Sequence, residues 1–255
     1  MLNMILHPAR QDKDLPPLVI AHGLFGSGCN WGAIARMLAT RRDVVAVDMR
    51  NHGSSFRANS QSYADMAGDL AEVLASLGPA DLLGHSMGGK AAMQLALTQG
   101  HLLRRLVVAD IAPVAYAHDQ TGHITAMRSL DLQGLSTRSE ADSRLALLVE
   151  DPALRAFFLQ SLDLKASPPM WRLNLDVLEA AMPQIIGWPD TKGCFDGPTL
   201  FLTGSQSTYV KPENRVIIRA LFPQARFAKL LGAGHWLHAE KPKAFAETVA
   251  LFLDD

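Results

Sequence analysis

Short apolar runs alternate with longer helical segments along this chain. The runs are rich in Val, Ile or Leu and cover residues 18–21, 44–47, 82–83, 106–109 and 199–203. Brief runs of this kind suit strands that are buried on both faces of a mostly parallel sheet. The alternation predicts an α/β protein with a doubly wound sheet and right-handed crossover connections.

Two segments carry a clear helical stripe. Apolar side chains from Tyr63 to Leu77 recur at the spacing of one helix face, and Gly78-Pro79 follows as a stop signal. Near the C-terminus Phe245, Val249 and Phe252 repeat this spacing, and Pro242 suits a first helical turn. We expect helices over 63–77 and from 242 onward.

The alternation fails between about residues 112 and 186. This stretch is rich in Met, Leu and Ala, contains Pro168-Pro169, and shows no convincing strand. Helical pieces are expected around residues 139–149, 153–159 and 171–181. Because the strand pattern resumes at 198, we interpret residues 112–186 as a helical cap inserted into one core, formed by residues 1–111 and 187–255.

Composition excludes several classes of protein. The net charge of −1 leaves no excess of Lys and Arg for a nucleic-acid surface. No run of eighteen apolar residues suggests a membrane span, and residues 1–8 make a poor signal peptide. The two cysteines, Cys29 and Cys194, are expected to be free thiols in a reducing cytosol. We expect a cytoplasmic monomer or small homo-oligomer that binds no nucleic acid.

The sharpest chemical signal is Gly84-His85-Ser86-Met87-Gly88, a G-x-S-x-G motif. It lies between a predicted strand ending at Leu83 and a predicted helix over 89–98. A serine on so tight a turn has a strained backbone and needs small neighbours, and the turn exposes its hydroxyl. The context favours Ser86 as a nucleophile over an idle serine in a glycine-rich turn.

A second motif, His22-Gly23-Leu24-Phe25-Gly26-Ser27, follows the run 18–21. An oxyanion hole needs two backbone N–H donors, one just after the nucleophile and one from a loop beside it. We expect Met87 to supply the first and Leu24 the second, with Phe25 as a possible substitute for Leu24. His22 itself is interpreted as a structural hydrogen-bonding residue.

The catalytic base is expected late in the chain, on a loop after a strand. His235, in Gly232-Ala233-Gly234-His235-Trp236, meets both conditions because it follows the predicted strand 226–231. The alternatives are a satisfied loop histidine at this position, or His238 as the base. His52 is expected to shape the pocket wall.

These motifs together resemble the α/β-hydrolase superfamily, in particular the small bacterial esterases of the YbfF type and their mitochondrial abhydrolase-domain relatives. The shared stretches are HGLFGS (22–27), VDMRNHGSS (47–55), GHSMGGK (84–90), DIAPV (110–114), NLD (174–176) and GAGHWLHAEKP (232–242). The resemblance implies the α/β-hydrolase fold, a helical cap over the active site, and hydrolysis of esters or thioesters without a cofactor.

The triad acid departs from the pattern of the superfamily. In much of the superfamily the acid lies on the loop after the strand that is here 199–203, where this chain has Ser207. Asp110 ends the run 106–109 and is our first choice. Asp176 in the insertion is the second, and Asp190 or Asp196 are further alternatives.

We therefore predict a serine hydrolase that cleaves esters or thioesters of small acyl substrates through Ser86, His235 and Asp110. The alternatives are a C–C bond hydrolase or a cofactor-free haloperoxidase on the same fold, or a small-molecule receptor with weak turnover. The nine histidines form no paired zinc motif and neither cysteine has a ligand-spaced partner, so no metal site is expected.

Aromatic residues near these motifs are the expected lining of the substrate pocket. Phe25 and Trp236 adjoin the two catalytic loops, and Phe157 and Trp171 lie in the insertion. The insertion has further apolar residues for an acyl-binding inner face, namely Met127, Leu147, Phe158 and Met170.

Overall fold

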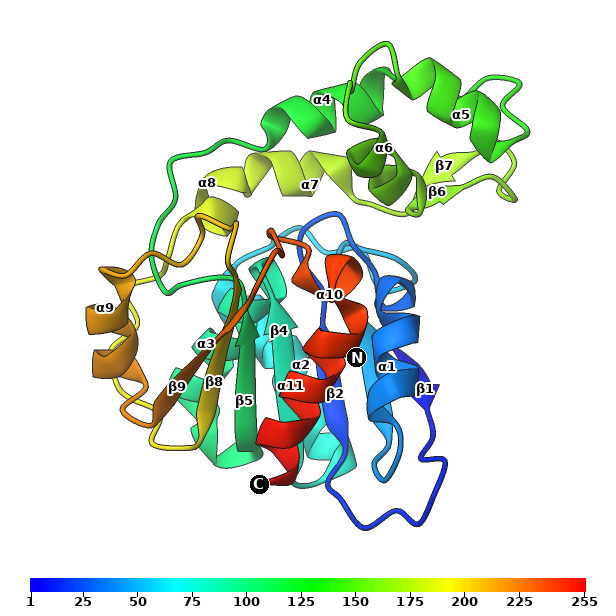
Figure 1. Cartoon of the computed structure of the whole chain (residues 1–255). Coiled ribbons are helices and arrows are strands. Elements are labelled where there is room, and N and C mark those ends of the chain that lie inside the picture. Colours follow the sequence, from blue (N-terminus) through cyan, green and yellow to red (C-terminus); the bar gives the residue numbers. More distant parts are fainter.

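A computed structural model describes residues 1–255 and contains a seven-stranded sheet (Figure 1). The strand order is β1-β3-β2-β4-β5-β8-β9. The strands are β1 (Asn3–His7), β2 (Leu18–Ala21), β3 (Val44–Asp48), β4 (Ala80–His85), β5 (Leu103–Ala109), β8 (Thr199–Gly204) and β9 (Ala225–Leu230). All neighbours pair in parallel except β1, which runs antiparallel to β3. The predicted doubly wound sheet is confirmed, although β1 was not foreseen.

Helices cover both faces of the sheet (Figure 1). α1 (Gly32–Leu38), α10 (Leu237–Glu240) and α11 (Pro242–Asp254) contribute to a cluster of 22 buried apolar residues on one face. α2 (Tyr63–Leu77), α3 (Met87–Gln99) and α9 (Asn214–Leu221) contribute to a cluster of 50 on the other. Short 3-10 turns, η1 (Gly28–Trp31) and η2 (Gly100–Leu102), join neighbouring elements. None of the helices has the length and apolar character needed to cross a lipid bilayer.

The predicted helix over 63–77 is confirmed with the bounds that the stripe indicated. Its N-terminus is capped by Ser62, whose hydroxyl accepts a hydrogen bond from the Asp65 N–H at 3.1 Å. Gly78 ends it with a φ of +79°, a conformation that glycine adopts without steric cost.

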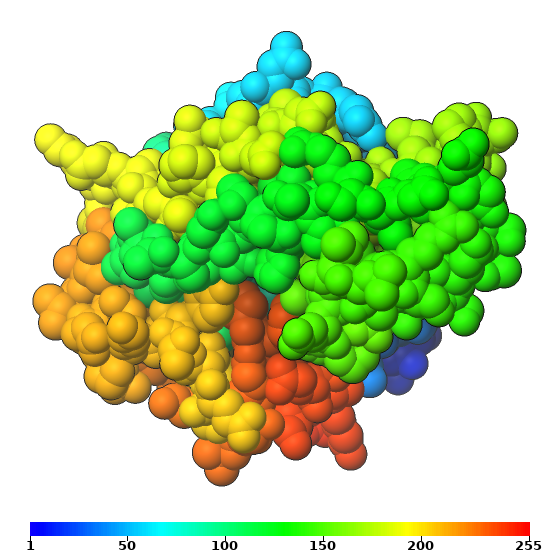
Figure 2. Space-filling model, turned by 90° about the horizontal axis from the view of Figure 1, so that it is seen from above, coloured from blue at the N-terminus to red at the C-terminus, as the bar shows by residue number.

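Residues between β5 and β8 lie over the carboxyl ends of the strands (Figures 1 and 2). They form α4 (Thr121–Ser129), α5 (Arg138–Leu145), α6 (Pro152–Leu159), α7 (Leu175–Ala180), α8 (Met182–Ile186) and a two-stranded sheet of β6 (Leu162–Asp163) and β7 (Met170–Trp171). The expectation that this stretch holds no strand was wrong, and the helix expected from 171 starts only at 175. We propose to treat residues 112–186 as a cap on a core of residues 1–111 and 187–255.

Candidate active site

Ser86 lies in the tight turn between β4 and α3. Its φ of +53° and ψ of −119° are strained for a residue with a side chain. The neighbouring glycines are required by space, because a Cβ on Gly84 would lie 2.3 Å from the Gly88 carbonyl oxygen, and one on Gly88 would lie 2.4 Å from the Ala21 carbonyl oxygen. The turn leaves Ser86 partly exposed at the N-terminus of α3.

His235 connects Ser86 to Asp110. Its Nε2 lies 3.1 Å from Ser86 Oγ, and its Nδ1 lies 2.7 Å from Asp110 Oδ2. The imidazole comes from the loop after β9, and Asp110 directly follows β5. The structure therefore brings together the three residues that the sequence singled out.

The Asp110 carboxylate is fully buried and is held from three sides. Its Oδ1 accepts a hydrogen bond from the Gly204 N–H at 3.0 Å, and its Oδ2 accepts one from the Ser207 hydroxyl besides the His235 contact. Buried charges in proteins need such partners. Ser207, at the position where much of the superfamily has an acid, thus binds the Asp110 carboxylate.

The alternative acids lie elsewhere. Asp176 is 88% exposed and forms an ion pair with Arg128 at 2.7 Å. Asp190 and Asp196 are also exposed, and none of the three contacts His235.

Two buried histidines hold the turn that carries Leu24. His22 donates from Nδ1 to the Gly23 carbonyl at 2.8 Å and accepts the Met49 N–H on Nε2 at 2.9 Å. His52 donates from Nδ1 to the Arg50 carbonyl at 2.8 Å, and its Nε2 accepts the Phe25 N–H at 3.3 Å. Burial lowers the pKa of both, to about 3 for His52. The structural role expected of His22 is confirmed, whereas His52 lies behind the cavity wall and does not line it.

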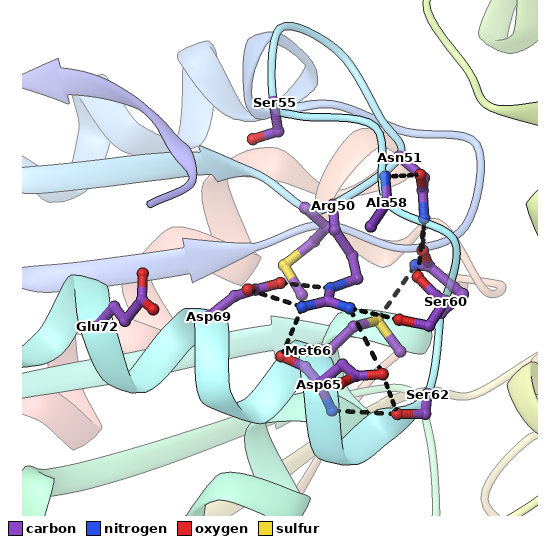
Figure 3. Close-up of polar contacts among 12 residues, drawn as sticks. Arg50, Asn51, Ser55, Ala58, Ser60, Ser62, Asp65, Met66, Asp69 and Glu72 are labelled. Carbon is purple, nitrogen blue, oxygen red and sulfur yellow. Dashed lines mark hydrogen bonds and ion pairs between the residues drawn. The ribbon is translucent and has the colours of Figure 1, made fainter.

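The motif at 47–55 anchors this turn to α2 (Figure 3). Arg50 forms two hydrogen bonds to the Asp69 carboxylate, at 2.6 and 2.9 Å, and a third to Ser60 Oγ at 2.8 Å. Asn51, at a φ of +63°, donates to Gln61 Oε1 at 2.8 Å. These contacts are structural, and they fix the loop from which His52 reaches Phe25.

Two backbone amides remain free beside Ser86. The Phe25 N–H is taken by His52, which leaves Leu24, whose N–H makes no hydrogen bond within the protein. Met87 is the first residue of α3, so its N–H has no intrahelical acceptor. Both amides are thus available to an oxygen, and the positive end of the α3 dipole favours a negatively charged one.

A cavity of about 830 Å³ lies between the cap and the core and contains Ser86 and His235 in its wall. Of the expected pocket residues Phe25, Phe157 and Trp236 line it. Trp171 does not, because it is buried inside the cap, where its Nε1–H donates to the Met127 carbonyl at 2.8 Å.

Of the other cap residues that were expected at the inner face, one lines the cavity and three do not. Phe158 lines the cavity, whereas Met127 is buried away from it. Leu147 and Met170 are 87% and 44% exposed on the outside. Apolar character alone did not separate these cases.

The cavity also has polar lining that sequence reasoning missed. Lys90 is 1% exposed, has no acidic partner, and donates from Nζ to the carbonyls of Ile186, at 2.9 Å, and Gly187. Burial lowers its pKa to about 7. Its position four residues after Ser86, on the same face of α3, was the available signal.

His85 binds the loop that carries His235. Its Nε2 donates to the His235 carbonyl at 2.9 Å, and burial lowers its pKa well below the ordinary value. The residue occupies the first variable position of the G-x-S-x-G motif.

Comparison with known proteins identifies the family of this chain. A family described as the alpha/beta hydrolase fold matches residues 16–242. Mouse sn-1-specific diacylglycerol lipase ABHD11 is 41% identical over 252 residues, which cover 95% of this chain and 82% of that protein. Esterase YbfF of Escherichia coli K12 is 37% identical, covering 100% of this chain and 99% of its own. A solved structure of a marine microorganism esterase is 34% identical and superposes with a TM-score of 0.91 over 98% of both chains. The chain therefore belongs to the α/β-hydrolase family, as its motifs indicated, and is a hydrolase of the esterase and lipase type.

Proposed function

We propose that the protein is a serine hydrolase that cleaves carboxylic esters or thioesters of small acyl substrates. The observation that carries this proposal is the chain of contacts from Ser86 Oγ through His235 to Asp110, at 3.1 and 2.7 Å. A nucleophile, a base and an orienting carboxylate within hydrogen-bond reach are the requirement for acyl transfer. The names of the relatives, an esterase and a lipase, support the same bond type.

In the first half-reaction Ser86 Oγ attacks the carbonyl carbon while His235 Nε2 takes the hydroxyl proton. The carbonyl oxygen becomes an oxyanion, which accepts hydrogen bonds from the Leu24 and Met87 N–H groups. The intermediate then collapses to an acyl-Ser86 ester, and the leaving alcohol or thiol takes the proton from His235.

In the second half-reaction water attacks the acyl-Ser86 ester while His235 Nε2 takes a proton from the water. The intermediate releases the carboxylic acid, and the proton returns to Ser86 Oγ. Asp110 accepts a hydrogen bond from the Nδ1–H of His235 throughout and stays ionised, which keeps Nε2 free to act as the base. Every step uses side chains, backbone amides and water, so we infer that no cofactor takes part. We also infer a cytoplasmic location, with which the two free cysteines agree.

The mostly apolar cavity lining supports an acyl group as the ligand. The test uses wild type and Ser86→Ala with p-nitrophenyl esters and acyl-CoA thioesters of increasing chain length. Wild type should cleave at least one series, and a fluorophosphonate probe should label it but not the variant. Equal labelling or equal turnover by a folded Ser86→Ala protein would contradict the proposal.

A further inference from the structure

The ring of Tyr209 lies face to face with the imidazole of His235. The two ring centroids are 3.9 Å apart and the planes differ by 16°. The other rings near His235 do not stack in this way, since Trp236 is 6.1 Å away at 62° and His85 is 4.8 Å away at 40°. One flat face of His235 is therefore covered by an aromatic face.

The backbone of Tyr209 is held independently of its ring. Its N–H donates to Ser207 Oγ at 3.3 Å, and its carbonyl accepts the Tyr116 hydroxyl at 2.8 Å. The Tyr209 hydroxyl lies 3.1 Å from His118 Nε2. The ring can therefore be replaced without removing the backbone contacts that position the loop.

Titratable groups surround His235 on several elements. Asp110 follows β5, His85 ends β4, His238 lies in α10, His118 precedes α4, and Tyr209 follows β8. Asp110 contacts the edge of the imidazole in the plane of the ring. Asp110 therefore does not cover either face of the imidazole, and the ring of Tyr209 covers one face.

An aromatic face carries negative potential and attracts a cation placed over it. In the proposed reaction His235 gains a proton and becomes a cation as Ser86 attacks. We propose that Tyr209 is a positioning residue whose ring fixes the plane of the His235 imidazole and stabilises its protonated form. The role of Tyr209 in catalysis rests on the proposed function. The stabilisation of protonated His235 by the Tyr209 ring does not, because it can be measured without turnover.

The first test compares Tyr209→Phe, which keeps the ring and removes the hydroxyl, with Tyr209→Leu, which removes the aromatic face. NMR titration of His235 gives its pKa directly, and the acidic limb of kcat/KM for a short p-nitrophenyl ester reports the same group in turnover. Tyr209→Leu should lower this pKa by about half a unit to one unit and kcat/KM by about three- to tenfold. Tyr209→Phe should match wild type in both, and Trp236→Leu, which removes an edge-on ring, should leave the pKa unchanged.

An unchanged pKa in a folded Tyr209→Leu protein would overturn the inference, as would an equal drop in Tyr209→Phe. If Tyr209→Leu does not fold, phenylalanines with one, two and three fluorines at position 209 replace it, because fluorine weakens the negative face at nearly constant shape. The His235 pKa should then fall stepwise, and a constant value would overturn the inference. If the pKa of His235 falls stepwise but the protein cleaves no ester, the inference about Tyr209 stands and the proposed function is refuted.

Discussion

The Asp110 carboxylate lies 2.7 Å from the His235 imidazole, although 125 positions separate the two residues in the sequence. Asp110 follows β5 and His235 follows β9, with β8 between these two strands in the sheet. The acid therefore reaches the histidine across the end of β8. Ser207, from the loop after β8, donates a hydrogen bond to the same carboxylate oxygen.

We predict that Asp110→Asn lowers kcat by a factor of about 10³ to 10⁴, because an amide no longer enforces the tautomer that leaves Nε2 as the base. Steady-state kinetics on a short p-nitrophenyl ester measures this. Asp176→Asn is the matched control and should change kcat less than about twofold, since an exposed ion pair contributes little. The reverse result would transfer the acid role to the cap.

We predict that Ser207→Ala lowers kcat by a factor of about 10 to 100, which corresponds to the loss of one hydrogen bond to a charged group. The carboxylate would keep the Gly204 amide and His235 as partners. The hydroxyl of Ser205, on the same loop, accepts a hydrogen bond from the Gly232 N–H at 2.8 Å and does not contact Asp110, so Ser205→Ala is the control and should leave kcat near the wild-type value. Equal losses in the two variants would assign the effect to the loop and not to the Asp110 contact.

The sequence predicted strands and helices correctly where the order of apolar and polar residues matches the burial of the element. All four residues of β2 are buried, and the stripe of α2 faces one side. β1 was missed because it is an edge strand whose residues alternate between half-buried and exposed, without a continuous apolar run.

The candidate site residues could be predicted only where the conformation of a turn, or the order of the residues along the chain, limits which residue can fill the role. Ser86 follows from the strand-to-helix turn, and Asp110 follows from the lack of a carboxylate at 204–210. Trp171 was misplaced because its apolar ring does not reveal whether it points to the cavity or into the cap. Tyr209 was missed because its stack on His235 exists only in the tertiary arrangement.

We predict that His238→Phe stabilises the protein, increasingly at acidic pH. His238 is buried and stacks on Trp31 at 4.1 Å, its Nδ1 has no hydrogen-bond partner, and burial lowers its pKa from 6.5 to about 3. Removing an unsatisfied buried nitrogen should raise the free energy of unfolding by about 1 kcal/mol at pH 7.

The sign of the pH effect follows from proton binding. Between pH 6.5 and about 3 the unfolded chain binds a proton at His238 that the folded protein does not, so wild type loses stability as the pH falls. The advantage of His238→Phe should grow by up to about 1.4 kcal/mol per pH unit across this window. Urea denaturation at several pH values measures it, with the exposed His101→Gln as control. Parallel stability curves for wild type and His238→Phe would contradict the prediction.

We predict that Phe157→Ala shifts the preference among acyl chain lengths, because Phe157 lines the cavity. Trp171→Ala should lower the melting temperature without that shift, since Trp171 is buried inside the cap and bonded to Met127. Ratios of kcat/KM across a chain-length series, together with thermal unfolding, separate the two effects. A shift in preference from Trp171→Ala alone would show that the cavity extends to that residue.

The hydrogen bond from Ser161 Oγ to the Phe25 carbonyl, at 2.9 Å, joins the cap to the turn that carries the Leu24 amide. In the proposed mechanism a substrate too bulky for the cavity would have to displace the segment around Ser161, and this would remove one of the two hydrogen bonds that hold Phe25, the other being the one to His52. The Leu24 amide, which we propose as an oxyanion donor, would then be less firmly held while the substrate is bound. Oversized esters should consequently occupy the enzyme without being turned over, and should act as competitive inhibitors of the smaller ones.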